Sequence, residues 1–204
     1  MTTKFIPKPY RIERNDCQAM LIDIQEKLAP HIAEHRKLLK KTAILIQGLQ
    51  ALNIPIMVNE QYPKGLGSTL PELTQLLSEK NTPVFEKTTF SVCDTPTSWH
   101  HIAQQNRNNV ILFGTETHVC VMQTALDLLD NGMQPIIITV LPNQHQRMAN
   151  KGLQAACGKR VKTVCGCRAA RSRAHRCTNS LACGFETHPW PRLSHARATA
   201  WPPI

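Results

Sequence analysis

The sequence predicts an α/β protein, a three-layer sandwich in which helices cover both faces of a central parallel, Rossmann-like sheet. The first observation is a regular alternation, through residue 140, of short apolar runs with segments that carry an apolar residue every three or four positions. The second is that the apolar runs, such as residues 110–113, are rich in β-branched residues and are bounded by turn residues. Apolar strands that alternate with helices are typical of parallel sheets covered on both faces.

The first half of the pattern contains two strands and two helices. The apolar run at residues 19–24 predicts a first strand, and the apolar spacing over residues 31–52 predicts a long amphipathic helix. A second strand follows at residues 55–58, and a loop with glycine and proline follows at residues 61–67. Pro71 suits the first turn of a short helix over residues 71–77.

The second half continues the alternation with three strands and two helices. Strands are expected at residues 82–86, 110–113 and 135–140, and helices at residues 97–105 and 119–130. The last of these helices ends at the stop signal Asn131-Gly132. In such a sheet, ligands bind beyond the carboxyl ends of the strands, so that edge is where functional residues are expected.

Charge and cysteine content divide the 204 residues near residue 140. Residues 1–140 contain 13 Lys and Arg and 13 Asp and Glu, whereas residues 141–204 contain 11 Lys and Arg and one acidic residue, Glu186. Three of the eight cysteines lie in the first part and five in the second. We therefore expect an α/β domain at residues 1–140 and a basic tail rich in Cys, Arg and Pro at residues 141–204.

We expect a cytoplasmic protein. The first residues lack the apolar core of a secretory signal, and no apolar run approaches the roughly 20 residues that cross a bilayer. Thiols stay reduced in the cytoplasm, so disulfides are not expected there.

Three residues that can carry chemistry follow three of the expected strands. Asp23 lies at the end of the first strand, Lys87 follows the third, and Cys120 follows the fourth in the first turn of a helix. The ends of parallel strands converge, so an acid, an amine and a thiol can meet there. The helix N-terminus and the charge of Lys87 are expected to favour a thiolate. Asp23 would take the thiol proton and later activate water, and backbone N–H groups of residues 115–120 would form an oxyanion hole.

Each of these residues also has a simpler interpretation. A cysteine in a helix is commonly a small buried hydrophobic residue. Asp23 could be a helix N-cap, and a lysine such as Lys87 is most often solvated at the surface. Only their joint placement at three strand ends favours the catalytic interpretation.

The motifs around these residues resemble those of the isochorismatase-like cysteine hydrolases. They are Asp-x-Gln after the first strand, Glu-Lys-x-x-x-Ser after the third, and Gly-x-x-x-x-x-Cys-Val before a helix. The segment Asn-Glu-Gln-Tyr-Pro-Lys-Gly-Leu-Gly at residues 59–67, with Pro-Glu-Leu at 71–73, is most similar to the isochorismatase domain-containing proteins of animals and their bacterial relatives. The resemblance covers about residues 15–140.

The resemblance implies a fold, a catalytic triad and an oxyanion hole. The fold is a three-layer α/β sandwich with a central parallel sheet, and the triad matches Asp23, Lys87 and Cys120. A cis peptide bond before the cysteine, by position Thr115–Glu116, is implied to orient an N–H of the oxyanion hole. Such a bond costs about 3–4 kcal/mol and persists only where its surroundings enforce it.

The resemblance also constrains the cofactor and the substrate. Nicotinamidases of this superfamily hold zinc through an Asp-x-His pair and a further His, whereas this chain has Asn59-Glu60-Gln61 at that place. Neither a metal nor nicotinamide is therefore implied, and no cofactor is expected. True isochorismatases lack the nucleophilic cysteine, so Cys120 implies cleavage of a small amide, imide or ester. The family also implies a homo-oligomer.

Three further side chains are candidates for binding a substrate. Gln25 would orient Asp23 or contact the substrate, and a structural hydrogen bond is the alternative. Tyr62 and Phe90 would form apolar walls of the site, although core packing suits Phe90 better. His118, close to Cys120, is expected to be a surface residue at the start of the helix.

The tail at residues 141–204 lacks the turn, helix and sixth strand that the resemblance implies after the fifth strand. A shifted reading frame, which would remove that helix and strand, explains its Arg, Cys, Pro, His and Trp content best. The alternatives are a disordered tail, a basic arm that binds nucleic acid, and a zinc module built on Cys165, Cys167, Cys177, Cys183 and His175. Neither a membrane nor nucleic acid is the expected partner.

Two functions therefore compete with the cysteine hydrolase. One is a non-catalytic interaction protein that keeps the fold and uses a basic tail. The other is an inactive product of a shifted frame.

Overall fold

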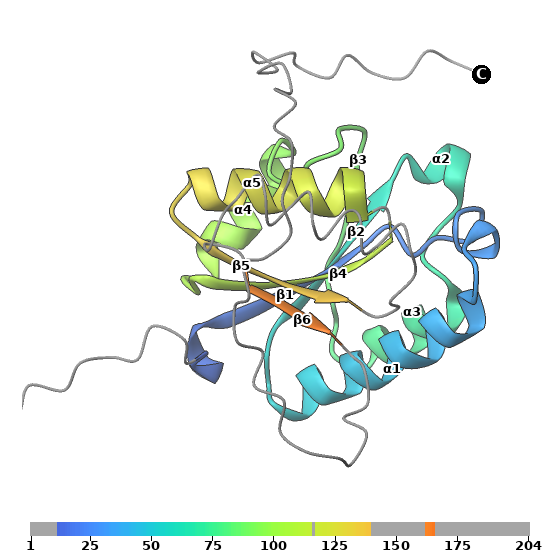
Figure 1. Ribbon diagram of the computed structural model, residues 1–204, viewed down its shortest axis with the longest axis horizontal. Coiled ribbons are helices and arrows are strands. Elements are labelled where there is room, and N and C mark those ends of the chain that lie inside the picture. Colours follow the sequence, from blue (N-terminus) through green and yellow to red (C-terminus); the bar gives the residue numbers. More distant parts are fainter. Residues whose placement is uncertain (1–11, 116, 140–161, 166–204) are drawn as a thin grey trace, which may run out of the picture. The chain divides into compact units, whose positions relative to one another are not determined.

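A computed structural model describes residues 12–115, 117–139 and 162–165, and it confirms the predicted α/β fold with a parallel sheet (Figure 1). The sheet has six strands in the order β3-β2-β1-β4-β5-β6, and every neighbouring pair is parallel. The strands are β1 (Cys17–Ile22), β2 (Ile56–Gln61), β3 (Val84–Lys87), β4 (Asn109–Gly114), β5 (Gln134–Thr139) and β6 (Lys162–Cys165).

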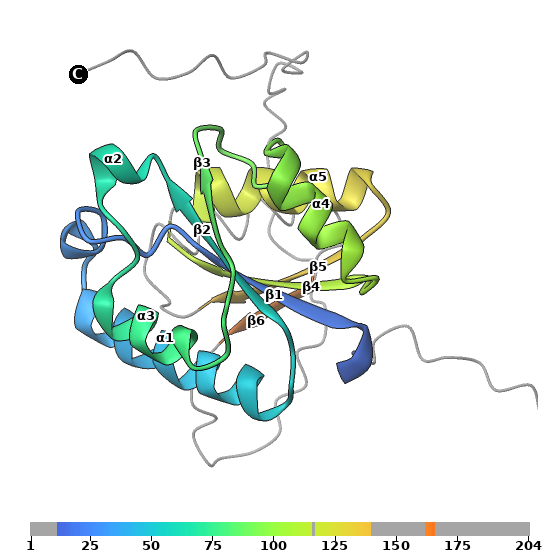
Figure 2. The same ribbon diagram turned by 180° about the vertical axis from the view of Figure 1, so that it is seen from behind.

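Helices cover both faces of the sheet, as Figures 1 and 2 show. Helices α1 (His35–Ala51) and α3 (Pro71–Ser78) lie on one face, and α4 (Pro96–Gln104) and α5 (Met122–Asp130) lie on the other. The short elements are η1 (Arg14–Asp16), η2 (Ala29–His31), α2 (Pro63–Leu66) and η3 (Thr117–Val121). No helix in the described ranges is long and apolar enough to span a bilayer.

The alternation of side chains along each strand builds two separate cores. In β1, Ala19 and Leu21 face the cluster that α1 and α3 complete, whereas Met20 and Ile22 face the cluster that α4 and α5 complete. Each of these side chains is at most 1% exposed. Burial of a large aliphatic side chain contributes about 1.5–3 kcal/mol, which explains why the strands are apolar on both faces.

The predicted elements are present, but several begin or end elsewhere. The helix predicted at residues 31–52 is interrupted, because Glu34 has a left-handed backbone (φ 61°) and only α1 continues beyond it. The segment predicted as a loop at residues 61–67 contains α2, which has Pro63 at its first position. Strand β2 extends to Gln61 although its last three residues are polar, since β1 and β3 flank it on both sides.

A sixth strand is present. The prediction that a shifted reading frame removes this strand is therefore wrong. Residues 162–165 pair in parallel with β5, in a register that aligns Ile136 with Lys162 and Thr139 with Cys165. The sheet thus continues beyond the boundary predicted near residue 140. The rest of the tail lies outside the described residues, and the division at 140 stays a prediction.

Candidate active site

The backbone after β1 is held in a conformation that few residues adopt. Asp23 has φ 55°, in the left-handed region that Asp tolerates better than most residues. Its N–H donates to the Asn59 carbonyl oxygen (3.0 Å), and its own carbonyl accepts from the Thr115 hydroxyl (2.5 Å). Asp23 is thereby fixed between the ends of β2 and β4.

Gly114 allows the ends of β1 and β4 to approach each other closely. A Cβ at this position would collide with the carbonyl oxygen of Ile22, so no other residue fits. Directly after it, the Thr115 N–H donates to the same Ile22 oxygen over 3.0 Å. This contact directs the chain past Asp23 and into η3, which carries Cys120.

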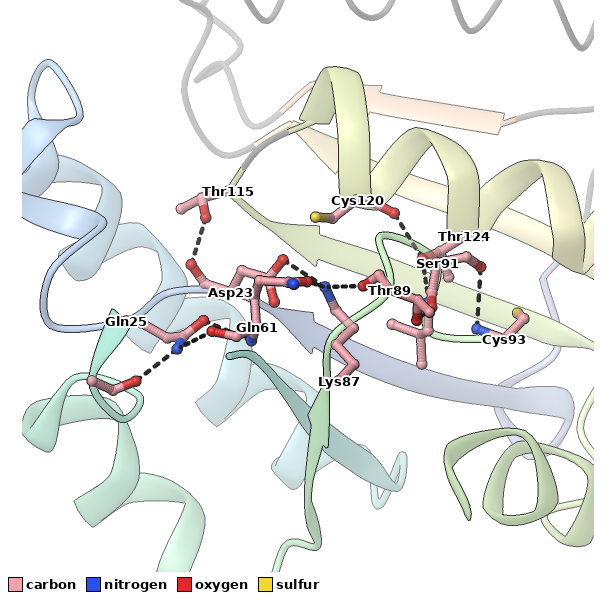
Figure 3. Close-up of polar contacts among 12 residues, drawn as sticks. Asp23, Gln25, Gln61, Lys87, Thr89, Ser91, Cys93, Thr115, Cys120 and Thr124 are labelled. Carbon is pink, nitrogen blue, oxygen red and sulfur yellow. Dashed lines mark hydrogen bonds and ion pairs between the residues drawn. The ribbon is translucent and has the colours of Figure 1, made fainter. Parts of the chain in front are cut away.

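Asp23 and Lys87 form a buried ion pair. Lys87, the last residue of β3, places its Nζ 3.0 Å from Asp23 Oδ2, and the two side chains are 0% and 1% exposed (Figure 3). Lys87 also donates to Gln61 Oε1 over 2.6 Å. The interpretations of Lys87 as a surface residue and of Asp23 as a helix N-cap are therefore wrong.

One oxygen of the buried carboxylate is not used by this ion pair. Asp23 Oδ1 has no hydrogen-bond partner among the described residues. A charged oxygen that is buried without a donor is costly, commonly by 1–3 kcal/mol or more. Such an oxygen is available to accept a proton or a hydrogen bond from a reacting group.

Cys120 lies beside the ion pair, in a π turn that precedes α5. The thiol lies in the first helical turn, as the sequence predicted, but this turn (Thr117–Val121) is a π turn and not an α turn. The side chain is 4% exposed and belongs to the same apolar cluster as Met20 and Ile22. The Thr124 hydroxyl donates to the Cys120 carbonyl over 2.7 Å and fixes the turn.

The surroundings of Cys120 favour the thiol, not the thiolate. Burial raises the pKa of Cys120 to about 12, the charge of Asp23 raises it further, and the charge of Lys87 acts in the opposite direction. Lys87 thus acts on the Cys120 pKa in the predicted direction, but burial outweighs it, so the thiolate expected in the resting protein is not favoured. At neutral pH the sulfur therefore carries its proton, and only the deprotonated form of a thiol is a nucleophile.

Asp23 is placed to receive that proton. Burial raises the pKa of the Asp23 carboxyl, while the charge of Lys87 and the Cys120 thiol act in the opposite direction. A carboxylate with a raised pKa is a stronger base than an exposed one, and its Oδ1 has no other described donor.

The predicted substrate-binding residues occupy three different environments. Gln25 is fully buried, and its amide binds only backbone: Nε2 donates to Gln61 O (2.9 Å) and Gly67 O (2.6 Å), and Oε1 accepts from Gln61 N (2.8 Å). Tyr62 is 54% exposed at the start of α2. Phe90 is partly buried against the Cys120 cluster. Gln25 thus supports the end of β2, while the roles of Tyr62 and Phe90 stay predictions.

The predicted oxyanion hole is described only in part. The N–H of Thr115 already donates to Ile22 O, which leaves it unavailable to a substrate. Glu116, and with it the predicted cis bond, lies outside the described residues. Cys120 remains as a candidate donor through its own N–H, and His118 is exposed as expected.

Sequence reasoning missed Gln61 as a residue of this site. It is 9% exposed, and it lies beside Lys87 at the paired ends of β2 and β3. The available signal was a polar run, residues 59–61, at the carboxyl end of an otherwise apolar strand. In the described part of the chain, no group of three or more His, Cys, Asp and Glu residues could hold a metal ion.

A cavity lies at the opposite edge of the sheet. Its volume is about 420 Å³, and its lining includes Pro55 before β2, Pro83 before β3, and Arg107 before β4. These residues mark the amino ends of the strands, whereas Asp23, Lys87 and Cys120 lie at the carboxyl ends. The cavity is therefore separate from the candidate site.

This fold is shared with isochorismatase-like hydrolases. Residues 18–159 match the isochorismatase domain, which is most of the chain. The protein belongs to the isochorismatase domain family, which confirms the resemblance noted in the sequence.

Curated relatives share the α/β domain of this chain. Isochorismatase family protein 1B of Dictyostelium discoideum is 38% identical over 122 residues, which are 58% of this chain and 59% of that protein. Isochorismatase domain-containing protein 1 of Danio rerio is 41% identical over 116 residues, 57% of this chain and 40% of that protein. The chain thus spans less than two thirds of the length of these relatives.

A solved structure extends the comparison. The structure described as MAR1 ribonuclease from Caenorhabditis elegans is 36% identical and has a TM-score of 0.66. The alignment covers 75% of this chain and 79% of that chain.

Proposed function

We propose that the protein is a cofactor-free cysteine hydrolase that cleaves a small amide, imide or ester through Cys120, Asp23 and Lys87. The observation that carries this proposal is the buried Asp23–Lys87 ion pair next to a buried thiol, at the edge of the sheet where parallel α/β folds bind ligands. A structural ion pair alone does not require a thiol beside it or a carboxylate oxygen without a donor.

In the first half of the reaction, the Cys120 proton moves to Asp23 as the sulfur attacks the carbonyl carbon of the substrate. The carbonyl oxygen becomes an oxyanion, which backbone N–H groups in residues 117–120 would stabilise. Asp23 then returns the proton to the leaving amine or alcohol, and a thioester on Cys120 remains.

In the second half, a water molecule gives one proton to Asp23 and attacks the thioester carbonyl. Collapse of this intermediate releases the carboxylic acid and the sulfur, which regains a proton from Asp23. Lys87 stays charged throughout and stabilises the negative charge that is shared by the carboxylate and the sulfur. Every step uses groups of the chain, the substrate and water.

The test compares two thiols of one chain. We expect Cys120→Ala to lower the hydrolysis of a panel of small amides, imides and esters at least about 10³-fold, since it removes the nucleophile. Cys93→Ala is the matched control, because that cysteine also has a pKa raised by burial but is not among the groups that shift the pKa of Asp23 or of Cys120. Equal activity of the Cys120→Ala protein and the wild type would exclude the proposal.

A second candidate function is the cleavage of RNA, because the C. elegans relative is described as a ribonuclease. Residues 1–140 carry equal numbers of acidic and basic residues, which is not the charge of a phosphate-binding surface. RNA hydrolysis by the wild type and by the Cys120→Ala protein separates the two candidates. RNA cleavage that survives in the variant would assign that activity to another part of the chain.

We also propose a homo-oligomer in a reducing compartment. Strand β3 is the last strand at one edge of the sheet, and its Val84 is 54% exposed. Light scattering on a sizing column measures the mass directly, and a monomer of 22.9 kDa would contradict this proposal.

A further inference from the structure

Gln61 makes the shortest contact of the Lys87 ammonium, although the reaction above does not use it. The distance from Lys87 Nζ to Gln61 Oε1 is 2.6 Å, against 3.0 Å to Asp23 Oδ2 and 3.5 Å to the Thr89 carbonyl (Figure 3). Hydrogen bonds to a charged donor are stronger than those between neutral groups. Gln61 is therefore a second, charge-assisted hydrogen-bond partner of the ammonium beside Asp23.

The ammonium also decides which way the Gln61 amide faces. A lysine ammonium has three donors and no acceptor, so only the amide oxygen can face it. The main chain of Gln61 is held as well, because the Gln25 amide binds both its N–H (2.8 Å) and its carbonyl (2.9 Å). The amide nitrogen consequently faces away from Lys87, with its N–H groups directed elsewhere in the site.

A second observation on the same strand also points to a ligand. Asn59 is two residues before Gln61 and therefore on the same face of β2, where Met57 belongs to the Cys120 cluster. Asn59 is fully buried, and neither its amide nitrogen nor its amide oxygen has a hydrogen-bond partner among the described residues. This face of β2 therefore carries two side-chain amides, and the buried one at Asn59 has no partner among the described residues.

We propose that Gln61 positions Lys87 through its oxygen and binds an acceptor oxygen of the substrate through its N–H groups. The proposal rests on the proposed hydrolase function and specifies its substrate class. The substrate is a small amide, imide or ester that carries a second carbonyl or a carboxylate next to the bond that is cleaved. The Gln61 N–H groups bind that second oxygen while Cys120 attacks the first carbonyl.

The test measures how Cys120 discriminates between a charged and a neutral alkylating agent. Iodoacetate and iodoacetamide are equal in size, but only iodoacetate carries a carboxylate. The rate constants are measured at Cys120 alone, by mass spectrometry of its peptide, because the chain contains seven other cysteines. The readout is the ratio of the two rate constants, which a general loss of stability does not change.

Gln61→Glu is the decisive variant. It keeps an oxygen for Lys87 but replaces the N–H donors with a second acceptor, so we expect the iodoacetate to iodoacetamide ratio to fall about tenfold, which corresponds to about 1.4 kcal/mol. Gln61→Met removes the N–H donors without adding a negative charge, so the ratio should fall in this variant as well. Gln50→Met is the control, because it removes one amide hydrogen bond, to the Leu76 carbonyl, far from the site. Its ratio should equal that of the wild type.

A competition experiment on the wild type keeps the proposal testable if the variants do not fold. Oxamate, an amide with a carboxylate beside it, should protect Cys120 from iodoacetamide at millimolar concentration, whereas formamide should not. An unchanged ratio in folded Gln61→Glu, or equal protection by oxamate and formamide, would overturn the proposal. If Cys120 does not react selectively at all, the hydrolase proposal fails instead.

Discussion

At the scale of single residues, the site combines a buried base, a buried cation and a buried thiol. Burial raises the pKa of Asp23 and of Cys120, and the opposing influence of Lys87 does not reverse either shift. In the resting site, the proton is therefore on the sulfur of Cys120. Beside it, the Oδ1 atom of Asp23 has no hydrogen-bond donor among the described residues. In the proposed reaction, this arrangement would allow proton transfer from Cys120 to Asp23.

The ion pair predicts a thermodynamic coupling between Asp23 and Lys87. Lys87→Met or Asp23→Asn alone should lower the free energy of unfolding by about 3–5 kcal/mol, because each leaves one charge buried without its partner. The double variant should lose less than the sum of the two. Urea unfolding of the four proteins measures the coupling, and strict additivity would show that the two charges do not interact.

At the scale of elements, the positions of the catalytic candidates follow from how the strands end. Asp23, Gln61 and Lys87 lie at the ends of three adjacent strands, β1, β2 and β3, and Gly114 ends β4 beside them. The two strand ends that carry Asp23 and Gly114 are bound to each other through the Thr115 N–H and hydroxyl. The close approach of β1 and β4 at Gly114 thus helps to position Asp23.

Gly114→Ala should force the ends of β1 and β4 apart. Its Cβ would collide with the Ile22 carbonyl, so we expect a loss of about 2 kcal/mol or more and a slower reaction at Cys120. Gly48→Ala is the opposite case, because that glycine lies within α1 and nothing lies within 4 Å of its added Cβ. There the substitution should raise stability by about 0.5–1 kcal/mol. Thermal unfolding of both proteins tests the pair.

At the scale of the whole molecule, the sequence predicted the class of fold and the meeting of Asp23, Lys87 and Cys120 at one edge of the sheet, but not the contacts that surround them. Strand and helix periodicity is a local signal, and it placed Asp23, Lys87 and Cys120 at one edge of the sheet. The contact of Gln61 with Lys87, 26 residues away, depends on the register of β2 and β3, which no local pattern specifies. The raised pKa of Cys120 depends on burial by segments far along the chain, so the predicted thiolate is not favoured in the resting protein.

Two buried thiols make the stability of the molecule depend on alkaline pH. Burial raises the pKa of both Cys93 and Cys120 to about 12, above the ordinary value of 9.0. The folded state holds both protons more tightly, so this contribution to stability is complete below pH 9.0 and is lost as the pH rises from there towards 12. Each thiol contributes a slope of at most about 1.4 kcal/mol per pH unit.

Urea unfolding between about pH 8 and pH 11 measures this dependence. The Cys93→Ser/Cys120→Ser double variant should lose stability less steeply with pH than the wild type. An identical slope in both proteins would mean that neither thiol is protonated preferentially in the folded state.

The central claim is that Asp23 holds the proton of Cys120 in place until it takes that proton itself. The most direct test is the rate of Cys120 alkylation by iodoacetamide against pH, in the wild type and in Asp23→Asn. Removal of the negative charge leaves Lys87 unopposed and should lower the pKa of Cys120, so alkylation near neutral pH should become about tenfold faster or more while hydrolysis falls about 10³-fold. Alkylation that slows together with hydrolysis, or that does not change, would contradict this account.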